Sequence, residues 1–332
     1  MQITVLMGGT SSERNVSLAS GIRIVQALRS RDHTVVALDP ARGVLSTTEE
    51  KKLSESDVGT EPPTLESLSN VSKEAFLPAL TTMPEMRSAD VVFLALHGGQ
   101  GEDGTLQALL DMADIDYTGS GHLASALAMD KDLSKKLFQA AGVQTADWLM
   151  APVSFEQVEG MLGLPVVVKP SKQGSTVGLS IVRDRKNLQP AIVEALKYDD
   201  EVMIERFIPG RELTVGVLGE LAFPVGEIIP KHEIYDYECK YTAGMADEEF
   251  PARLTPESSA YVQQQALSAF GALKLRGCAR IDFRMSESGE FYCLEANTLP
   301  GMTELSLVPQ GAAAMGIDFP ELCDRIVQLA LK

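Results

Sequence analysis

The sequence contains few cysteines and few histidines, and neither residue occurs in a pattern that supports catalysis or zinc binding. Its four cysteines, Cys239, Cys278, Cys293 and Cys323, lack CxxC spacing. Its four histidines are scattered without an HExxH or similar motif. We therefore expect the cysteines to pack as small apolar side chains in a reducing compartment, and any metal ion to be held by oxygen ligands.

Basic residues are scarce relative to acidic ones. The chain has 29 Lys and Arg residues against 46 Asp and Glu residues, which gives a formal net charge of −17. Nucleic-acid recognition usually needs a basic surface that displaces counterions, so this composition argues against a nucleic-acid partner. A nucleotide is not excluded, because a few lysines, backbone amides and metal ions can create a local positive field.

Long apolar segments are absent from the sequence. Residues 1–10 lack the basic and apolar regions of a signal peptide, and no later run approaches the ~18 apolar residues of a membrane-spanning helix. We expect a cytoplasmic protein that does not insert into a membrane.

The remaining composition is that of a folded protein with more than one domain. Hydrophobic residues make up 45% and charged residues 23% of the 332 residues, and a chain of this length predicts two or three domains. An apolar run over residues 2–7, followed by a glycine turn and a helix, predicts the start of an α/β domain. Short apolar runs at 35–38 and 91–96 are typical of parallel strands covered on both faces. The segment 41–88 between them suggests a partly helical, partly mobile insertion.

The rest of the chain predicts strands that alternate with polar loops. Turn residues around Gly119 and a strand near residue 204 suggest boundaries that divide the chain into domains 1–119, 120–204 and 205–332. The expected elements are a helix over 125–141, strands at 164–170, 202–208, 212–218, 278–285 and 291–296, and a final helix at 319–331.

The last two of these strands predict a hairpin with a tight turn at residues 288–289. A turn centred there places Asp282 opposite Glu295. The same register places Arg280 opposite Asn297, so the four polar residues share one face. The other face then pairs Ile281 with Ala296, Phe283 with Leu294, and Met285 with Tyr292, an apolar set suited to a core. We expect Ile281, Phe283, Leu294 and Tyr292 to be largely buried.

Two carboxylates at opposed positions of a hairpin repel each other unless a cation lies between them. Directly opposed Cβ atoms are about 4.5 to 5.5 Å apart. Asp282, Glu295 and Asn297 offer the hard oxygen ligands that Mg²⁺ prefers, to be completed by substrate phosphate oxygens. A solvated face in which Arg280 bridges the two acids is the alternative, and the hairpin alone does not decide between them.

A glycine-containing loop at 170–178 follows the apolar strand that ends at Lys169. Its backbone amides could fold over phosphate groups, although it is not a Walker A sequence and many such loops are only turns. Lys131 and Lys169 could each contact phosphates, whereas an isolated lysine is usually a solvated surface charge. No GxGxxG motif follows the first strand, which argues against a dinucleotide-binding oxidoreductase.

Several segments together resemble those of the ATP-grasp enzymes, and specifically the D-alanine:D-alanine ligase family, across nearly the whole chain. The resemblance implies a mixed α/β fold of three domains, with the nucleotide between the second and third. The similar segments, in order, are Met7–Ser17, Leu96–Thr105, Tyr117–Gly121, Lys169–Gly178, Tyr235–Tyr241 and Leu294–Thr303.

The resemblance also implies a role for individual residues. Glu13 would hold the ammonium group of the first substrate and bond to Ser175, which in turn would meet Tyr241 on a mobile lid. Arg280 and the Gly301 amide would stabilise charge that develops during the reaction. Other substrate contacts would come from His97, Ser306 and Leu307. The nucleotide would bind Lys131, Lys169, Glu205 (adenine), Phe207, Ile208, Glu212 (ribose) and Lys240, and two Mg²⁺ ions, or Mn²⁺, would bind Asp282, Glu295 and Asn297.

The resemblance predicts an enzyme that uses ATP to join two D-alanines through an acyl phosphate, for peptidoglycan precursor synthesis, and that forms a homodimer. Tyr241 matches the tyrosine of the peptide-forming branch, so we expect a dipeptide rather than an ester with D-lactate. Cys239, Asn15, Leu299 and the Glu304-Leu305 pair depart from the family pattern. Because some of these lie near the second substrate, a ligase with a different second substrate remains an alternative, as does a catalytically silent nucleotide-binding protein.

Overall fold

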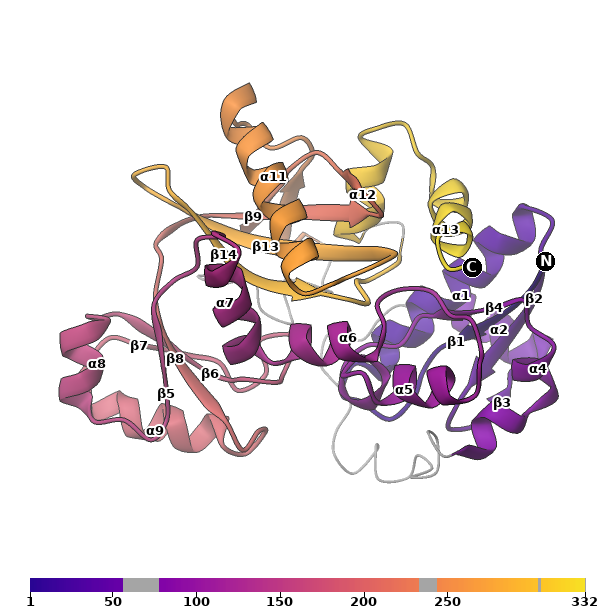
Figure 1. Ribbon diagram of the computed structural model, residues 1–332, viewed down its shortest axis with the longest axis horizontal. Helices are drawn as coiled ribbons and strands as arrows, with labels where there is room; N and C mark the ends of the chain where they lie inside the picture. The colour runs from indigo at the N-terminus through magenta and orange to yellow at the C-terminus, as the bar shows by residue number, and fades with distance from the viewer. Residues whose placement is uncertain (56–77, 233–243, 304–305, 332) are drawn as a thin grey trace.

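The computed structural model describes residues 1–55, 78–232, 244–303 and 306–331. Within these residues the strands form three separate sheets, one from the beginning of the chain, one from its middle and one from its later part. Figure 1 shows the first sheet at one end of the molecule, the second at the other end, and the third above and between them. The mixed α/β fold agrees with the sequence prediction.

The first sheet has the strand order β3-β2-β1-β4, and its three longer strands are parallel. Its strands are covered on both faces, as the apolar runs predict: one set of side chains packs against α1 and the other against α4 and α5. The elements are β1 Gln2–Leu6, α1 Arg14–Ser30, β2 Thr34–Asp39, β3 Gly43–Val44, α2 Thr47–Ser54, α4 Pro84–Arg87, β4 Val91–Leu94 and α5 Thr105–Met112. Part of the predicted insertion, residues 56–77, lies outside the described residues.

The C-terminal helix completes the core of this first sheet. Helix α13 (Phe319–Gln328) buries Leu322, Cys323 and Ile326 in the same apolar cluster as Ile24 of α1. Figure 1 shows α13 beside α1, although the two are far apart in sequence. The two ends of the chain are therefore held together by a shared core.

The second sheet is antiparallel, with the order β5-β8-β6-β7. One face packs on two helices through the buried residues Val158, Val166 and Ile192, among others. Its elements are β5 Trp148–Met150, α8 Phe155–Met161, β6 Val166–Pro170, β7 Ser180–Val182, α9 Arg185–Ala195 and β8 Val202–Arg206.

The third sheet has the order β12-β11-β9-β13-β14, with β10 paired to β9. Its apolar face packs against α11 and α7 (Lys131–Ala140), while the opposite face carries Glu212, Thr214 and Asp282 toward the second sheet. The elements are β9 Gly210–Leu218, β10 Leu221–Ala222, β11 Gly226–Pro230, β12 Ala246–Glu249, α11 Pro256–Ala272, β13 Cys278–Ser286, β14 Phe291–Asn297 and α12 Leu307–Ala313.

The β13-β14 hairpin confirms part of the predicted register and corrects the rest. Asp282 pairs with Glu295 and Arg280 with Asn297, as predicted. A bulge follows Asp282, so that Phe283 pairs with Cys293 and Leu294 becomes the extra residue. The predicted burial of Leu294 and Tyr292 is therefore wrong: both are only partly buried, and Phe291 and Cys293 occupy the apolar face with Ile281 and Phe283.

The single helix predicted over 125–141 is two helices, α6 (His122–Met129) and α7 (Lys131–Ala140). The chain breaks at Asp130, whose backbone is extended and whose side chain accepts a hydrogen bond from the Leu133 amide. Asp130 thus caps α7, because an aspartate satisfies an amide that the first helical turn leaves unpaired.

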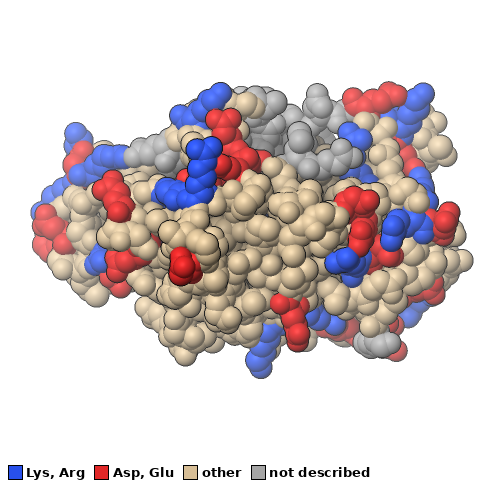
Figure 2. All heavy atoms as spheres, turned by 90° about the horizontal axis from the view of Figure 1, so that it is seen from above, with Lys and Arg blue, Asp and Glu red and all other residues tan. Residues whose placement is uncertain are grey.

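Charged side chains of both signs lie on the face of the molecule that is seen from above in Figure 2. Figure 2 shows Lys and Arg interspersed with Asp and Glu, mostly toward the two ends of that face. Cys278, Cys293 and Cys323 are buried and free, which agrees with the predicted packing role. Within the described ranges, no helix is both long and apolar enough to cross a membrane.

Candidate active site

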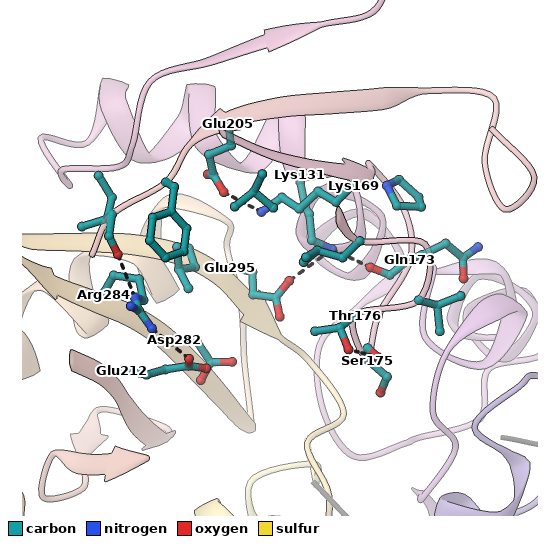
Figure 3. A pocket seen from close by; sticks show the side chains of 18 of the residues that line it. Lys131, Lys169, Gln173, Ser175, Thr176, Glu205, Glu212, Asp282, Arg284 and Glu295 are labelled. Atoms are coloured by element: carbon teal, nitrogen blue, oxygen red, sulfur yellow. Dashed lines mark hydrogen bonds and ion pairs between the residues drawn. The ribbon is translucent and has the colours of Figure 1, made fainter. Parts of the chain in front are cut away.

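A pocket lies between the second and third sheets and is lined by β6, β8, β9, β13, β14 and the glycine-containing loop after β6. Its empty volume is about 1020 Å³, including open solvent at its mouth. A cleft between two sheets, with a few polar groups among apolar walls, is a common place for a small-molecule ligand or cofactor to bind. Figure 3 shows acidic and basic side chains from both sheets directed into it.

At one end of the pocket, Glu205 on β8 is held between two lysines. Lys169 Nζ donates to Glu205 Oε2 at 2.7 Å, and Lys135 Nζ donates to Glu205 Oε1. Burial opposes ionisation of Glu205, but the two ammonium groups outweigh it and lower the pKa of this carboxyl to about 2. Glu205 is therefore an ionised acceptor at neutral pH.

Beside Glu205, apolar side chains form the walls of the pocket. Val167 lines it from the second sheet, Phe207 and Ile208 from the connection between β8 and β9, and Leu294 from the third sheet. Leu294 reaches the pocket because of the bulge in β14. A flat apolar group with polar edges, such as a purine, fits walls of this kind.

A second acidic group follows along β9. Glu212 accepts a hydrogen bond from Arg284 Nη1 at 3.2 Å, and Arg284 also donates to the carbonyls of Ile208 and Gly210. Arg284 thereby fixes the connection between β8 and β9. Glu212 lines the same pocket, as Figure 3 shows.

The two opposed carboxylates of the hairpin both face this pocket. Asp282 Oδ1 accepts a hydrogen bond from Thr214 Oγ1 at 2.7 Å. The Arg280 guanidinium donates hydrogen bonds to both carboxylate oxygens of Asp282. Asn297 Nδ2 donates to Asp282 Oδ2 at 2.9 Å. Glu295 Oε2 lies 3.1 Å from Lys131 Nζ, which also donates to the Gln173 carbonyl. Basic side chains neutralise both acids.

This donor set fits magnesium in its chemistry. Two carboxylates and one amide side chain supply hard oxygen ligands, and Mg²⁺ usually adds phosphate and water oxygens to one or two such carboxylates. In the part of the chain that the structure describes, no group of three His, Cys, Asp or Glu side chains is arranged to hold a metal ion. The ion would therefore depend on Asn297 and on the nucleotide for its remaining ligands.

The glycine-containing loop connects the pocket to the first sheet. Ser175 Oγ donates a hydrogen bond to Glu13 Oε1 at 2.5 Å, which joins this loop to the residue that precedes α1. Ser175 and Thr176 both have positive φ values, 51° and 59°. Backbone strain of this kind persists only where the surroundings hold it, and it often marks a ligand-binding segment.

His97 and Glu102 support the loop that follows β14. His97 is buried, and its Nδ1 and Nε2 atoms lie 2.8 Å from the Leu299 carbonyl and 3.3 Å from Ser20 Oγ. Burial lowers the pKa of His97 and favours the neutral ring. The Glu102 carboxyl accepts hydrogen bonds from the backbone amides of Leu299 and Gly98. Burial and the nearby charge of Glu13 raise its pKa to about 7.

The predicted Gly301 and Ser306 lie at the end of the same loop. A Cβ atom on Gly301 would lie 3.0 Å from Ser306 Oγ, so a larger residue would press on that hydroxyl. Ser306 precedes α12 and accepts from the Thr303 amide, while Leu307 lines the pocket. Lys240 and Tyr241 lie outside the described residues, and so do Cys239, Glu304 and Leu305.

Comparison with known proteins identifies the family. Residues 2–120 match the family described as D-ala D-ala ligase N-terminus, and residues 130–328 match D-ala D-ala ligase C-terminus. The chain belongs to the D-alanine–D-alanine ligase family. The resemblance of the sequence segments is thereby confirmed.

Individual members of this ligase family match along their whole length. A D-alanine–D-alanine ligase of Syntrophotalea carbinolica is 40% identical over 98% of this chain and 95% of that protein. The ligase of Aquifex aeolicus is 40% identical over 98% of this chain and all of its own.

Solved structures agree with the sequence comparison. The structure of a D-alanine–D-alanine ligase from Bacillus anthracis complexed with ATP has a TM-score of 0.78, with 32% identity over 100% of this chain and 97% of that chain. A D-Ala:D-Ser ligase from Enterococcus faecalis has a TM-score of 0.81, with 29% identity over 99% and 98%. The mixed α/β ATP-grasp fold expected of the ligase family is thus that of this chain.

Sequence reasoning missed Lys135, Arg284 and Glu102. The sequence does hold a signal for the first, because Lys131, Ser134, Lys135 and Phe138 follow the spacing of one buried helical face. It also holds one for Arg284, which lies two residues beyond Asp282 on the same strand. Glu102 carries no such signal, because its partners are backbone amides of distant loops.

Proposed function

We propose that the chain joins two D-alanines into D-alanyl-D-alanine with ATP, as a step in peptidoglycan precursor synthesis. The observation that carries this proposal is the Ser175–Glu13 hydrogen bond at 2.5 Å, because it connects the pocket to a carboxylate at the start of α1, which packs on the first sheet. Family membership supports the same reaction.

The chemistry follows from the low reactivity of a carboxylate. A carboxylate oxygen of the first D-alanine bonds to the γ-phosphorus of ATP, the bond to ADP breaks, and an acyl phosphate forms. The neutral amine of the second D-alanine then attacks the acyl carbon. It loses a proton as the peptide bond forms, and inorganic phosphate leaves.

The nucleotide would lie between the second and third sheets. Glu205, with its acceptor oxygens fixed, would take the adenine amino group, Phe207 and Ile208 would contact the ring, and Glu212 would take the ribose. The remaining nucleotide contacts are proposed for Lys131, Lys169 and Lys240.

Asp282, Glu295 and Asn297 would hold two Mg²⁺ ions, with Mn²⁺ as a substitute. When bound, such ions spread the negative charge of the phosphate groups. Arg280 is already oriented by its hydrogen bonds to both carboxylate oxygens of Asp282, so its charge is held in the same region before a ligand binds. Together with the Gly301 amide it would stabilise the tetrahedral oxyanion.

Glu13 would hold the ammonium group of the first D-alanine, with Ser175 fixing the orientation of its carboxylate. His97, Ser306 and Leu307 would border the amino-acid site. The two ring nitrogens of His97 face Leu299 and Ser20, which favours an indirect role through the loop.

We propose that Tyr241, which lies outside the described residues, selects the second amino acid. We infer that its neutral hydroxyl extends the Glu13–Ser175 pair and disfavours D-lactate, so the product is a dipeptide. A different second substrate is the alternative, and the likeness to a D-Ala:D-Ser ligase makes D-serine its specific form. Product analysis by mass spectrometry at equal D-alanine, D-serine and D-lactate separates these: a mainly D-alanine dipeptide supports the proposal, and comparable ester or serine product contradicts it.

Release of ADP with D-alanine, L-alanine or buffer tests the activity itself. We expect release only with D-alanine. Equal release with L-alanine would indicate another carboxylate–amine ligase, and no release with any amino acid would indicate a silent nucleotide-binding protein.

We also propose a homodimer in the bacterial cytoplasm, with domains at 1–119, 120–204 and 205–332. The free buried cysteines suit a reducing compartment. Light scattering on the purified protein tests the dimer, and a single species at the monomer mass would refute it.

A further inference from the structure

Lys135 is an exception to the usual placement of lysine. Its side chain is 0% exposed, although lysine is almost never fully buried unless it is paired. It lies on the inward face of α7 with Lys131 and Phe138. Its ammonium group donates to Glu205 Oε1 and, at 2.5 Å, to Thr145 Oγ1. The nitrogen also lies 5.0 Å from the centre of the Trp148 ring.

The two lysines that hold Glu205 differ in their access to the ligand. Lys169 lines the pocket and holds Glu205 Oε2. Lys135 does not line the pocket. It donates to the other carboxylate oxygen, Glu205 Oε1, from outside the pocket. A triphosphate in the pocket can draw the Lys169 ammonium away from Glu205. It cannot reach Lys135, because that group is enclosed.

A chain of hydrogen bonds fixes Lys135 in this position. Thr145 Oγ1 accepts from Lys135 and donates to the Cys293 carbonyl on β14 at 2.7 Å. Glu205 is therefore tied to the third sheet through Lys135 and Thr145. The carboxylate keeps its orientation even when Lys169 leaves it.

We propose that Lys135 is a positioning residue that fixes Glu205 as a hydrogen-bond acceptor and thereby sets the preference for adenine over 6-oxopurine nucleotides. This inference rests on the proposed placement of adenine against Glu205. An ionised carboxylate only accepts hydrogen bonds, so it attracts a 6-amino group and repels a 6-oxo group. A site built for one such hydrogen bond rejects the analogue that lacks it.

Nucleotide binding tests this role without requiring turnover. Dissociation constants for ADP and inosine diphosphate are measured by titration calorimetry on wild type and Lys135→Met. We expect the variant to bind ADP about tenfold more weakly and to lose about tenfold in its preference for ADP over inosine diphosphate. In turnover, KM for ATP should rise with little change in KM for D-alanine. A merely structural lysine would not change the ratio of the two nucleotides.

Lys136→Met is the matched control, because Lys136 is the next residue of α7, is 58% exposed and pairs with Asp132. Its nucleotide preference should equal that of wild type. If Lys135→Met does not fold, Thr145→Val is the second variant. It keeps the shape of the side chain but removes the hydroxyl that holds Lys135. It should lower the preference for ADP over inosine diphosphate to a smaller degree.

An unchanged ADP preference in Lys135→Met, or in Thr145→Val if the first variant is insoluble, would overturn the inference. Wild-type protein that binds the two nucleotides equally would also overturn it. Failure of the proposed function is a different result, since nucleotide selectivity would then persist without any release of ADP in the presence of D-alanine.

Discussion

Charged side chains in the pocket are paired with each other before a ligand arrives. Lys131 contacts Glu295, Lys169 contacts Glu205, and Arg280 contacts Asp282. Each pair keeps two charges close to the positions at which phosphate or metal would compete for them. The site is thus electrostatically preorganised, and binding exchanges partners rather than burying new unpaired charge.

Replacement of Glu295 with Gln tests the role of this carboxylate in turnover. The side chain is partly exposed and contributes little to packing, so we expect kcat to fall by about 100-fold or more while the midpoint of thermal unfolding changes little. Glu290→Gln, at the exposed turn of the same hairpin, is the control and should leave kcat unchanged. A Glu295→Gln enzyme with wild-type kcat would refute the metal assignment.

Glu102 predicts a specific dependence of stability on pH. Its pKa is raised from 4.5 to about 7, so the folded protein holds this proton more tightly than the unfolded chain does. The stabilising contribution is complete below about pH 4.5 and is lost as the pH rises through 7. Glu102→Gln, which imitates the protonated acid, should therefore gain stability relative to wild type between pH 5.5 and pH 8. Thermal unfolding midpoints of both proteins, measured across this pH range, test the prediction. A difference in midpoint that does not change with pH would contradict it.

Individual elements were predicted best where one periodicity dominates. The alternation of polar and apolar residues placed β13 opposite β14 at Asp282 and Glu295. The bulge at Leu294 was not predicted. One inserted residue leaves the local alternation of polar and apolar residues intact, but beyond it each side chain points to the opposite face of the sheet. The break at Asp130 could have been predicted from its capping position, but the continuous apolar pattern concealed it.

Contacts between elements were the least predictable part of the site. Lys135 and Glu205 are 70 residues apart, and they meet only because α7, which packs on the third sheet, also lies next to β8. Thr145 and the Cys293 carbonyl are separated by 148 residues. The resemblance to a family supplied Glu13 and Ser175, which no local pattern connects.

Gly210, at the start of β9, tests the connection between the second and third sheets. A Cβ atom there would lie 2.1 Å from the Met285 carbonyl, and its φ of 132° also disfavours other residues. Gly210→Ala should therefore lower the free energy of unfolding by more than about 3 kcal/mol. Gly289→Ala, with φ 87° but no atom within 4 Å of its Cβ position, should cost only about 1 kcal/mol of strain. If denaturant titrations gave equal losses of unfolding free energy for the two variants, the close contact with the Met285 carbonyl would be unimportant.

The molecule as a whole is joined by the core that α13 shares with the first sheet. Leu322 is 0% exposed in that core, so Leu322→Ala should lower the free energy of unfolding by about 2 to 5 kcal/mol. Leu329→Ala, 48% exposed just beyond the helix, is the control and should change it by less than about 0.5 kcal/mol. Hydrogen exchange should speed up in β1 and β4 of the Leu322→Ala variant as well as in α13. Faster exchange confined to α13 would contradict a shared core.

We propose that this enzyme activates a D-alanine carboxylate as an acyl phosphate and joins it to a second D-alanine. D-alanine labelled with ¹⁸O in its carboxylate, incubated with the wild-type protein, ATP and Mg²⁺, tests it most directly. Mass spectrometry should find one ¹⁸O atom in the inorganic phosphate for each dipeptide formed, because the carboxylate oxygen that bonds to phosphorus leaves with it. Unlabelled phosphate, or phosphate released without dipeptide, would contradict the account.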